Sequence, residues 1–341
     1  MYRAIRPLLF QLEPERAHDL TIQLLRLAGA LPPVRAFLRA YFRGPDRPVE
    51  LFGLKFRNPV GLAAGYDKDG LAWRGLACLG FSHLELGTVT PRPQDGNPRP
   101  RVFRLPADRA VINRMGFPGR GADFLRGRLD HRPRDFILGI NLGKNKVTPL
   151  ETAHQDYLSL MRTFARYADY LAVNVSSPNT VGLRSLQARA QLTELLTELQ
   201  AERQKQAAAL GKNVPLLVKL APDLNEHELA DALEALMDAQ VDGVIATNTT
   251  LQRPKLNSAN ARETGGLSGA PLSALSTHLI ARINALTSGK LPIIAVGGVM
   301  DAAEARAKLD AGAALVQVYT GLIYSGPGLV REILSGLGTQ N

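Results

Sequence analysis

The stretch that decides the fold is residues 170–184, YLAVNVSSPNTVGLR. It begins with apolar and β-branched residues, which is typical of a buried strand. The strand ends at SSPNT, where Pro178 lacks a backbone donor and Asn179 tolerates turn geometry. Alone, a Ser-Pro-Asn sequence is more often a capped turn than a site. Here Asn174 is polar within the apolar run, and several other strands of the chain also end in polar groups.

The same unit, a short apolar strand followed by a polar end and a helical stretch, repeats along the chain. The predicted strands are 59–64, 83–88, 136–141, 170–175, 215–220, 243–248, 292–296 and 314–319. The predicted helices are 68–79, 119–129, 151–168, 186–209, 226–239, 271–287, 301–311 and 327–335. Eight such units predict an α/β fold, the (β/α)₈ TIM barrel, because five or six would have favoured an open sheet.

Two long excursions, 89–118 and 249–270, interrupt the repeat and are rich in Pro, Gly, Arg or Asn. Long segments after barrel strands lie at the catalytic face, so we expect both to border the site.

Residues 1–45 predict an N-terminal helical extension, and the proline-rich residues 44–48 predict a linker into a barrel domain at 46–341. Pro7 predicts a short first segment, whereas Pro14 suits the first turn of a second helix. These helices combine apolar stripes with arginines. Such a pair can pack as a cap on its own domain or touch a membrane interface, and the pattern leaves both open.

The 341 residues carry a formal net charge of +10, which suits anionic partners without choosing between nucleic acid, lipid and small molecules. The single cysteine, Cys78, excludes an internal disulfide, a four-cysteine zinc site and an iron–sulfur cluster within the chain. The sequence contains no run of 18 apolar residues, so it predicts no membrane-spanning helix. The first residues do not resemble a cleaved signal or transit peptide, because acidic residues soon follow a short apolar run.

The carboxyl ends of the predicted strands concentrate amide, hydroxyl and ammonium groups, with almost no carboxylates. This composition disfavours a metal site. The histidines His83, His131 and His154 fall away from those ends, so no Ser-His-Asp set is predicted.

The last two strands are followed by glycines and backbone donors, in VGG (296–298) and YTG (319–321). In barrels this position commonly binds a phosphate group, so a phosphate-bearing ligand is predicted. The run GGLSG (265–269) follows no strand in the manner of a dinucleotide-binding fold and does not predict one.

Two lysines, Lys68 and Lys219, lie at predicted strand ends. Lys219 stands among apolar neighbours and therefore fits a solvated surface position poorly. A lysine there can neutralise an anion, stabilise an electron-rich ring or form a Schiff base. Four amides could surround one small polar molecule such as a cyclic imide or ureide with a carboxylate. They are Asn113, Asn174, Asn179 and Asn248.

With these motifs in place, the chain resembles the class 2, quinone-dependent dihydroorotate dehydrogenases, in their bacterial form. The resemblance covers nearly the whole chain, in order. It rests on NPVGLAAGYDKDG (58–70), ELGTVTPRPQDGNPRPRVFRL (85–105), INRMGF (112–117), GINLGKN (139–145), VNVSSPNTVGLR (173–184), VKLAPD (218–223), TNTT (247–250), GGLSG (265–269), VGGV (296–299) and QVYTGL (317–322).

The resemblance implies bound FMN, oxidation of dihydroorotate to orotate in pyrimidine synthesis, and reoxidation by a membrane quinone. It makes Ser177 the base for ring carbon 5, helped by Thr180 and Phe117, with hydride leaving ring carbon 6 for the flavin. The implied substrate residues are Lys68, Asn113, Arg114, Met115, Gly116, Phe117, Asn174, Asn179, Asn248 and Thr249. The implied FMN residues are Ala64, Gly65, Tyr66, Asp67, Lys68, Thr88, Asn141, Asn174, Lys219, Thr247, Gly269, Gly298, Tyr319 and Thr320.

Two features indicate class 2. The soluble class uses a cysteine where this chain has Ser177, and it lacks the helical extension that forms the quinone tunnel and touches the membrane. The implied location is the cytoplasmic side of the inner membrane, peripherally bound, without nucleic acid or an iron–sulfur partner subunit.

Three other readings fit less well. Dihydrouridine synthases normally carry a catalytic cysteine and a separate RNA-binding domain, and this sequence shows neither. A lysine-dependent aldolase would use Lys219 as a Schiff base. A non-enzymatic membrane binder leaves the polar strand ends unexplained.

Overall fold

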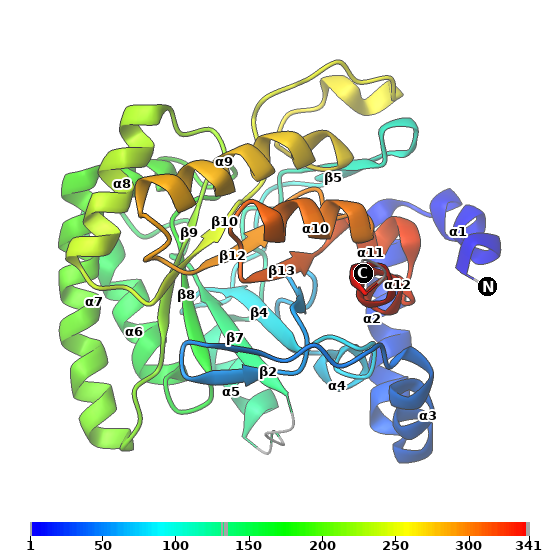
Figure 1. The fold of residues 1–341 in the computed structure, drawn as a ribbon, viewed down its shortest axis with the longest axis horizontal. Helices are drawn as coiled ribbons and strands as arrows, with labels where there is room; N and C mark the ends of the chain where they lie inside the picture. Colours follow the sequence, from blue (N-terminus) through cyan, green and yellow to red (C-terminus); the bar gives the residue numbers. More distant parts are fainter. Residues whose placement is uncertain (1, 131, 133–135, 339–341) are drawn as a thin grey trace.

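The computed structural model describes residues 2–130, 132 and 136–338. Eight parallel strands close into a barrel in the order β10-β12-β13-β3-β4-β7-β8-β9 (Figure 1). They are β3 (Val60–Leu62), β4 (His83–Val89), β7 (Ile137–Leu142), β8 (Tyr170–Asn174), β9 (Leu216–Leu220), β10 (Gly243–Ala246), β12 (Ile293–Val296) and β13 (Leu315–Val318). Each overlaps a predicted strand, so the predicted TIM barrel is confirmed.

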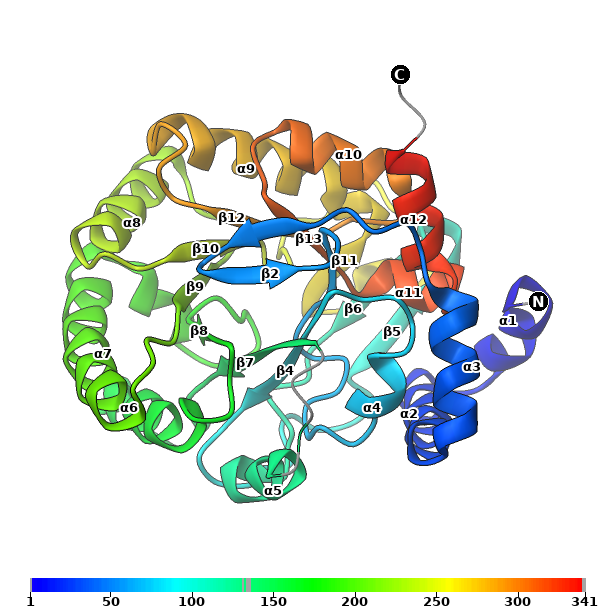
Figure 2. The ribbon, with the colours of Figure 1, turned by 60° about the horizontal axis from the view of Figure 1, so that its bottom comes forward.

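Helices surround the barrel in an outer ring (Figure 2). They are α4 (Trp73–Leu76), α5 (Gly121–Leu129), α6 (Ala153–Phe164), α7 (Arg189–Leu210), α8 (Glu226–Asp238), α9 (Ser273–Leu286), α10 (Ala302–Asp310) and α12 (Leu329–Leu337). The short helix α11 (Thr320–Ser325), which the sequence did not predict, follows β13 directly. Side-chain caps explain some of the starts: Asn225 and Glu228 form a capping box at α8, and Asp301 accepts from the Glu304 N–H at α10.

An antiparallel hairpin closes the amino end of the barrel. Its strands are β1 (Val49–Leu51) and β2 (Leu54–Phe56). Phe56 is fully buried and belongs to an interior cluster with Tyr170, Leu217 and Ile245, against which the rest of the hairpin packs. Hydrophobic burial on this side leaves the carboxyl end as the open face, where a site can form.

The two long excursions meet in a small antiparallel sheet over that open face. Its strands are β11 (Gly266–Gly269), β6 (Ala110–Asn113) and β5 (Val102–Leu105), in that order. The turns η1 (Pro106–Asp108), η3 (Ala259–Arg262) and η4 (Ala270–Leu272) flank them. The sequence predicted only loops here, because β11 pairs with a strand far away in the chain and no local alternation signals that pairing.

The N-terminal extension consists of α1 (Tyr2–Gln11), α2 (Pro14–Ala30) and α3 (Pro32–Phe42) and lies beside α4, α11 and α12 (Figures 1 and 2). As predicted, α2 begins at Pro14. The Glu13 carboxylate caps it by accepting from two N–H groups of the first turn. Helix α2 packs on α4 so closely that a Cβ at Gly29 would lie 2.5 Å from the Gly75 nitrogen.

The prediction that Pro7 keeps the first segment short is wrong, because α1 continues through it to Gln11. Contacts from the barrel domain hold this helix. The Tyr2 hydroxyl donates to the Ile323 carbonyl at 2.6 Å, and Arg6 donates to the Tyr324 carbonyl at 3.0 Å. These tertiary contacts offset the helix hydrogen bond that proline cannot make.

Candidate active site

A cavity of about 580 Å³ opens at the carboxyl ends of the barrel strands and continues beneath the N-terminal extension. Its inner part is lined by side chains from the strand ends, including Asn174, Lys219 and Thr88. Its outer part is lined mainly by apolar residues of the extension. These are Ile5, Leu9, Phe10, Ala17, Leu24, Leu25, Ala28, Leu38 and Phe42. The volume falls within the range of small-molecule and cofactor sites.

A network of side chains from three neighbouring strands supports the floor of the inner part, with Thr88 and Asn174 lining the cavity and Asn141 behind them. Asn174 Nδ2 donates to Thr88 Oγ1 at 2.9 Å and to Asn141 Oδ1 at 3.1 Å, and Thr88 Oγ1 donates to Asn141 Oδ1 at 2.5 Å. These residues are buried, so their hydrogen bonds fix the side chains that face a ligand.

Below this floor, Glu85 places a carboxylate inside the barrel. It accepts from Asn141 Nδ2 at 2.8 Å, Gln317 Nε2 at 2.9 Å and the Tyr170 hydroxyl at 3.0 Å. Three donors from three strands make the buried charge tolerable. Glu85 therefore holds Asn141 and supplies a negative charge under the site.

Lys219, on β9 beside Asn174 in the strand register, points into the cavity from a buried position. Within the described residues, its Nζ makes no hydrogen bond. Burial lowers the pKa of Lys219, while the charge of Glu85 acts in the opposite direction. A buried ammonium of this kind suits an anionic or electron-rich ligand.

The loop after β8 carries Ser177 against the cavity. Ser177 Oγ accepts from the Asn179 N–H at 3.2 Å, and Asn179 Nδ2 donates to Asn113 Oδ1 at 3.3 Å. The loop is also held by Asn97, whose Nδ2 donates to the carbonyls of Arg114 and Asn179 at 3.0 and 3.2 Å. Two loops from distant parts of the chain thus meet beside Ser177.

A buried ion pair joins this region to the N-terminal extension. Arg101 donates to both oxygens of Glu15 on α2, at distances of 2.8 to 3.2 Å, and the two side chains are only 7% and 8% exposed. Its remaining nitrogen donates to the carbonyls of Asp95 and Asn97. The same arginine therefore contacts the extension and the loop that holds Asn179.

Glycines shape the end of the cavity near β12 and β13. A Cβ at Gly298 would lie 2.4 Å from Ser273 Cα, so only glycine fits there, and φ is +76°. Ser268 and Thr320 line the same cavity, and their Oγ and Oγ1 atoms lie 2.9 Å apart. Backbone donors and hydroxyls without a carboxylate form a cradle of the kind that binds phosphate.

The structure brings most of the predicted site residues to one cavity. Those that line it are Ser177, Phe117, Lys68, Asn113, Met115, Gly116, Asn174, Asn179, Asn248, Thr249, Ala64, Gly65, Tyr66, Thr88, Lys219, Thr247, Gly269, Gly298, Tyr319 and Thr320. Four do not line it: Thr180, Arg114, Asp67 and Asn141.

The side chains of two of these four are engaged elsewhere. Asp67 accepts from the N–H groups of Leu71 and Ala72, at 2.7 and 2.8 Å, and burial raises its pKa to about 6. Arg114 pairs with Glu263 at 2.7 Å. Asp67 and Arg114 can therefore act at the site through their backbone or by holding loops.

The sequence predicted that three histidines lie away from the carboxyl ends of the strands, and the structure describes two of them. His83 is buried where its strand begins, with Ser82 Oγ 2.9 Å from its Nδ1, and His154 on α6 faces Glu198. His131 lies outside the described residues. Among the described residues, no cluster of three or more His, Cys, Asp or Glu could hold a metal ion.

Sequence reasoning missed several cavity residues. In the inner part these include Ser268 and Gln317, and in the outer part His18, Thr21 and Arg104. Ser268 and Gln317 lie inside motifs that were recognised, GGLSG (265–269) and QVYTGL (317–322), so their positions there could have indicated them. The extension residues carried only a helical periodicity, which does not say which side faces a cavity.

Comparison with known proteins decides the family. A family model for dihydroorotate dehydrogenase matches residues 48–340. The chain belongs to the dihydroorotate dehydrogenase family. It is 53% identical to the dihydroorotate dehydrogenase (quinone) of Acidithiobacillus ferrooxidans, over 98% of this chain and 94% of that one. It is 50% identical to the dihydroorotate dehydrogenase (quinone) of Vibrio parahaemolyticus, over 99% and 100%.

Solved structures of the family have the same fold. The dihydroorotate dehydrogenase of Eimeria tenella in complex with ferulenol has a TM-score of 0.86 and 39% identity, covering 97% of this chain and 93% of that one. The ligand-free structure from the same organism also has a TM-score of 0.86, at 42% identity, covering 95% and 94%. The likeness therefore includes the extension as well as the barrel, and it makes the chain an oxidoreductase of this family.

Proposed function

We propose that the chain oxidises dihydroorotate to orotate with FMN as its bound cofactor and a membrane quinone as electron acceptor, in pyrimidine synthesis. The observation that carries this proposal is that the inner and outer parts of the cavity have different linings. A polar inner part for a flavin and a small acid continues into an apolar passage beneath the extension. The names of the relatives, dihydroorotate dehydrogenase (quinone), support the same substrate and acceptor.

The inner cavity fits FMN by the chemistry of its donors. Lys219 offers a buried ammonium, Thr88 and Asn174 offer hydrogen bonds, and the glycine cradle near Gly298 offers room and donors for a phosphate. Bound FMN would accept a hydride from ring carbon 6 of the substrate and later give two electrons to quinone.

The substrate would lie against the amides. Asn113, Asn174, Asn179 and Asn248 all line the inner cavity, and Lys68 offers a positive charge for its carboxylate. Ser177 Oγ would take the proton from ring carbon 5. Because serine is a weak base, Thr180 and Phe117 remain the proposed partners of proton removal.

The quinone would enter between α1 and α2. Among the apolar side chains there, His18 and Arg104 are polar groups that could bind a quinone oxygen. We accordingly propose residues 1–45 as the quinone and membrane extension and 46–341 as the catalytic barrel.

We propose that the extension binds peripherally to the cytoplasmic side of the inner membrane, and its surface supports contact with a membrane. Nine of the fifteen exposed large apolar side chains in the described chain belong to it: Ile5, Leu8, Leu12, Leu20, Leu24, Leu27, Leu31, Phe37 and Tyr41. Arginines on the same helices suit anionic lipid. No helix in the described part is long and apolar enough to span a bilayer.

The test is an absorbance spectrum of the purified protein, followed by anaerobic addition of dihydroorotate. The expected result is a flavin spectrum that bleaches and then recovers when a soluble quinone is added. A flavin that does not bleach would contradict the substrate, and failure to bind added FMN would contradict the cofactor.

A further inference from the structure

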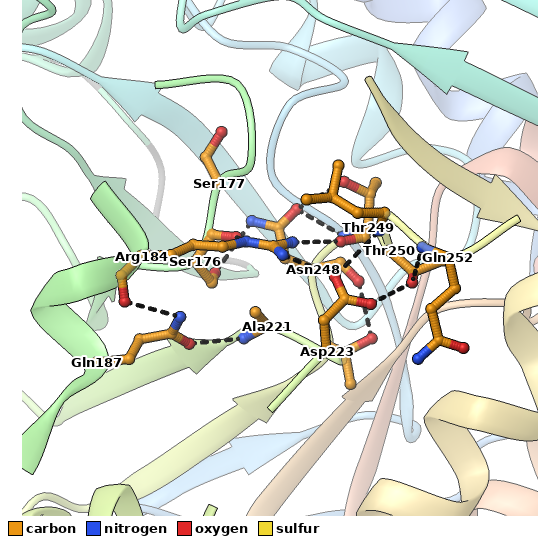
Figure 3. A network of polar contacts seen from close by, with 12 residues as sticks. Ser176, Ser177, Arg184, Gln187, Ala221, Asp223, Asn248, Thr249, Thr250 and Gln252 are labelled. Atoms are coloured by element: carbon orange, nitrogen blue, oxygen red, sulfur yellow. Dashed lines mark hydrogen bonds and ion pairs between the residues drawn. The ribbon is translucent and has the colours of Figure 1, made fainter. Parts of the chain in front are cut away.

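Arg184 binds the turns that follow three neighbouring barrel strands. It lies in the short helical turn η2 (Leu183–Gln187), at the end of the loop that carries Ser177. Its Nε donates to the Ser176 carbonyl at 3.1 Å, and its Nη2 donates to the Thr249 carbonyl at 2.9 Å. Its Nη1 donates to Asp223 Oδ2 at 2.7 Å. Figure 3 shows the guanidinium lying between these groups.

Asp223 extends the contact into the loop after β10. Its Oδ2 also accepts from the Leu251 N–H at 3.0 Å, and its Oδ1 accepts from the Thr250 hydroxyl. Thr250 Oγ1 accepts in turn from the Gln252 N–H at 2.9 Å. The Arg184 and Asp223 side chains are only 21% and 18% exposed, so water screens this charge pair weakly.

A second side chain docks η2 on the barrel. Gln187 is buried, its Oε1 accepts from the Ala221 N–H at 2.9 Å, and its Nε2 donates to the Arg184 carbonyl at 3.4 Å. The backbone that carries Arg184 is therefore held at the end of β9, so the guanidinium extends from a fixed part of the chain.

The two carbonyls that Arg184 binds lie next to the proposed base and to a proposed substrate-binding amide. Ser176 precedes Ser177, and Thr249 follows Asn248. Asn248 Nδ2 also donates to Ser176 Oγ at 3.0 Å. In Figure 3 the Ser177 side chain points away from the guanidinium, so Arg184 does not contact the reacting atoms.

We propose that Arg184, paired with Asp223, is a positioning residue that holds Ser177 in register with Asn248 and Thr249 while the proton leaves the substrate. This inference rests on the proposed function. Proton transfer depends steeply on geometry, and a misplacement of about 1 Å can cost about 100-fold in rate. Lysine cannot replace Arg184 here, because a single ammonium lacks the planar fork that reaches three acceptors.

The experiment uses full-length Arg184→Lys enzyme with FMN bound. The bleaching of FMN by dihydroorotate is followed anaerobically by stopped flow, with hydrogen or deuterium at ring carbon 5, and reoxidation by a soluble quinone is measured separately. We expect bleaching to slow by about 30- to 100-fold and the isotope effect at carbon 5 to rise, with reoxidation unchanged. Bleaching within about twofold of wild type with the same isotope effect would overturn the proposal.

Arg203→Lys is the matched control. Arg203 on α7 also pairs with an aspartate, Asp242, at 2.7 Å and donates to the Val214 carbonyl at 2.9 Å, but it does so where the strands begin. We expect this control to leave the carbon 5 isotope effect at the wild-type value. If the isotope effect rose as much as in Arg184→Lys, the loss of any buried ion pair would change it, and the positioning role would be overturned.

Asp223→Asn covers the case in which Arg184→Lys does not bind FMN. It keeps the shape of the side chain but removes the charge that orients Arg184, and we expect slower bleaching with a raised isotope effect. Wild-type behaviour of Asp223→Asn would overturn the proposal. If wild-type enzyme itself is not bleached by dihydroorotate, the proposed function fails and the positioning role falls with it.

Discussion

The inner and outer parts of the cavity differ in how their side chains are held. In the inner part, Asn174, Thr88 and Asn141 hydrogen-bond to one another at the ends of rigid strands. The outer part is formed by helices whose walls are leucine, alanine and phenylalanine. Directional contacts suit a small polar substrate and a proton transfer, whereas an apolar passage suits a long flexible quinone tail.

If the proposed function holds, this difference predicts that each half-reaction depends on one part of the cavity. Reduction of the cofactor should depend on the strand ends, and its reoxidation should depend on the extension. A change confined to one part should therefore alter one half-reaction and spare the other. A change at the joint between the two parts, the buried Glu15–Arg101 pair, should affect both.

The largest effect is expected in the inner part, from Ser177→Ala. Loss of a general base costs about 100- to 10,000-fold, so bleaching of FMN by dihydroorotate should slow by a factor in that range. Reoxidation by quinone should stay as in wild type, because Ser177 lies at the strand ends. Stopped-flow absorbance measures both steps.

Ser185→Ala is the control, since Ser185 is exposed and its hydroxyl donates only within its own turn, to the Gly182 carbonyl. Equal losses in both half-reactions of Ser177→Ala would contradict the separation of the two parts.

The inner part was also the part that the sequence predicted best. Asn174 and Lys219 stand out because each is polar within a buried strand, and the barrel repeat says that strand ends meet. The role of Arg184 was not predicted, because it depends on carbonyls that lie far apart in the chain. The sheet of β5, β6 and β11 was missed for the same reason. Local patterns fix elements and strand ends, but not the contacts between distant loops.

The joint between the two parts should respond next, through Glu15→Ala. Glu15 on α2 is buried against Arg101, which also holds the loop carbonyls of Asp95 and Asn97. Removing one partner of a buried pair typically costs about 3–5 kcal/mol; the lower value is expected because Arg101 keeps its two carbonyl acceptors. The midpoint of urea unfolding should fall, and both half-reactions should slow.

Asp46→Ala is the control for Glu15→Ala. Asp46 pairs with Arg43 on the surface, where water screens the charges, so its unfolding midpoint should change little. If Glu15→Ala matched this control, the buried pair would not connect the two parts.

A smaller, selective effect is expected in the outer part from Ala17→Phe. Ala17 lines the passage on α2, and a phenyl ring there would occupy space that the quinone needs. Reoxidation by a long-tailed quinone should slow about 10-fold, equivalent to about 1.4 kcal/mol, with bleaching unchanged. Ala30→Phe, at the exposed end of the same helix, should change neither step. A loss in bleaching would mean that the passage and the substrate site are not separate.

The smallest expected effect is a pH dependence of the stability of the fold. It comes from His18, at the boundary of the two parts. Burial lowers the pKa of His18 to about 4; Lys68 adds to this, while Glu15 and the Tyr66 backbone oppose it. In the unfolded chain the pKa is about 6.5. Between these values the unfolded state binds more protons, so stability is full above about pH 6.5 and is lost as the pH falls toward 4.

Thermal unfolding, followed by FMN fluorescence at pH 7.5, 6 and 5, tests this contribution. We expect the melting temperature of His18→Gln to fall less on acidification than that of wild type, because glutamine takes up no proton. His227→Gln, at an exposed site on α8, should keep the wild-type slope. An unchanged slope in His18→Gln would show that burial does not hold His18 neutral, and that water reaches this side chain.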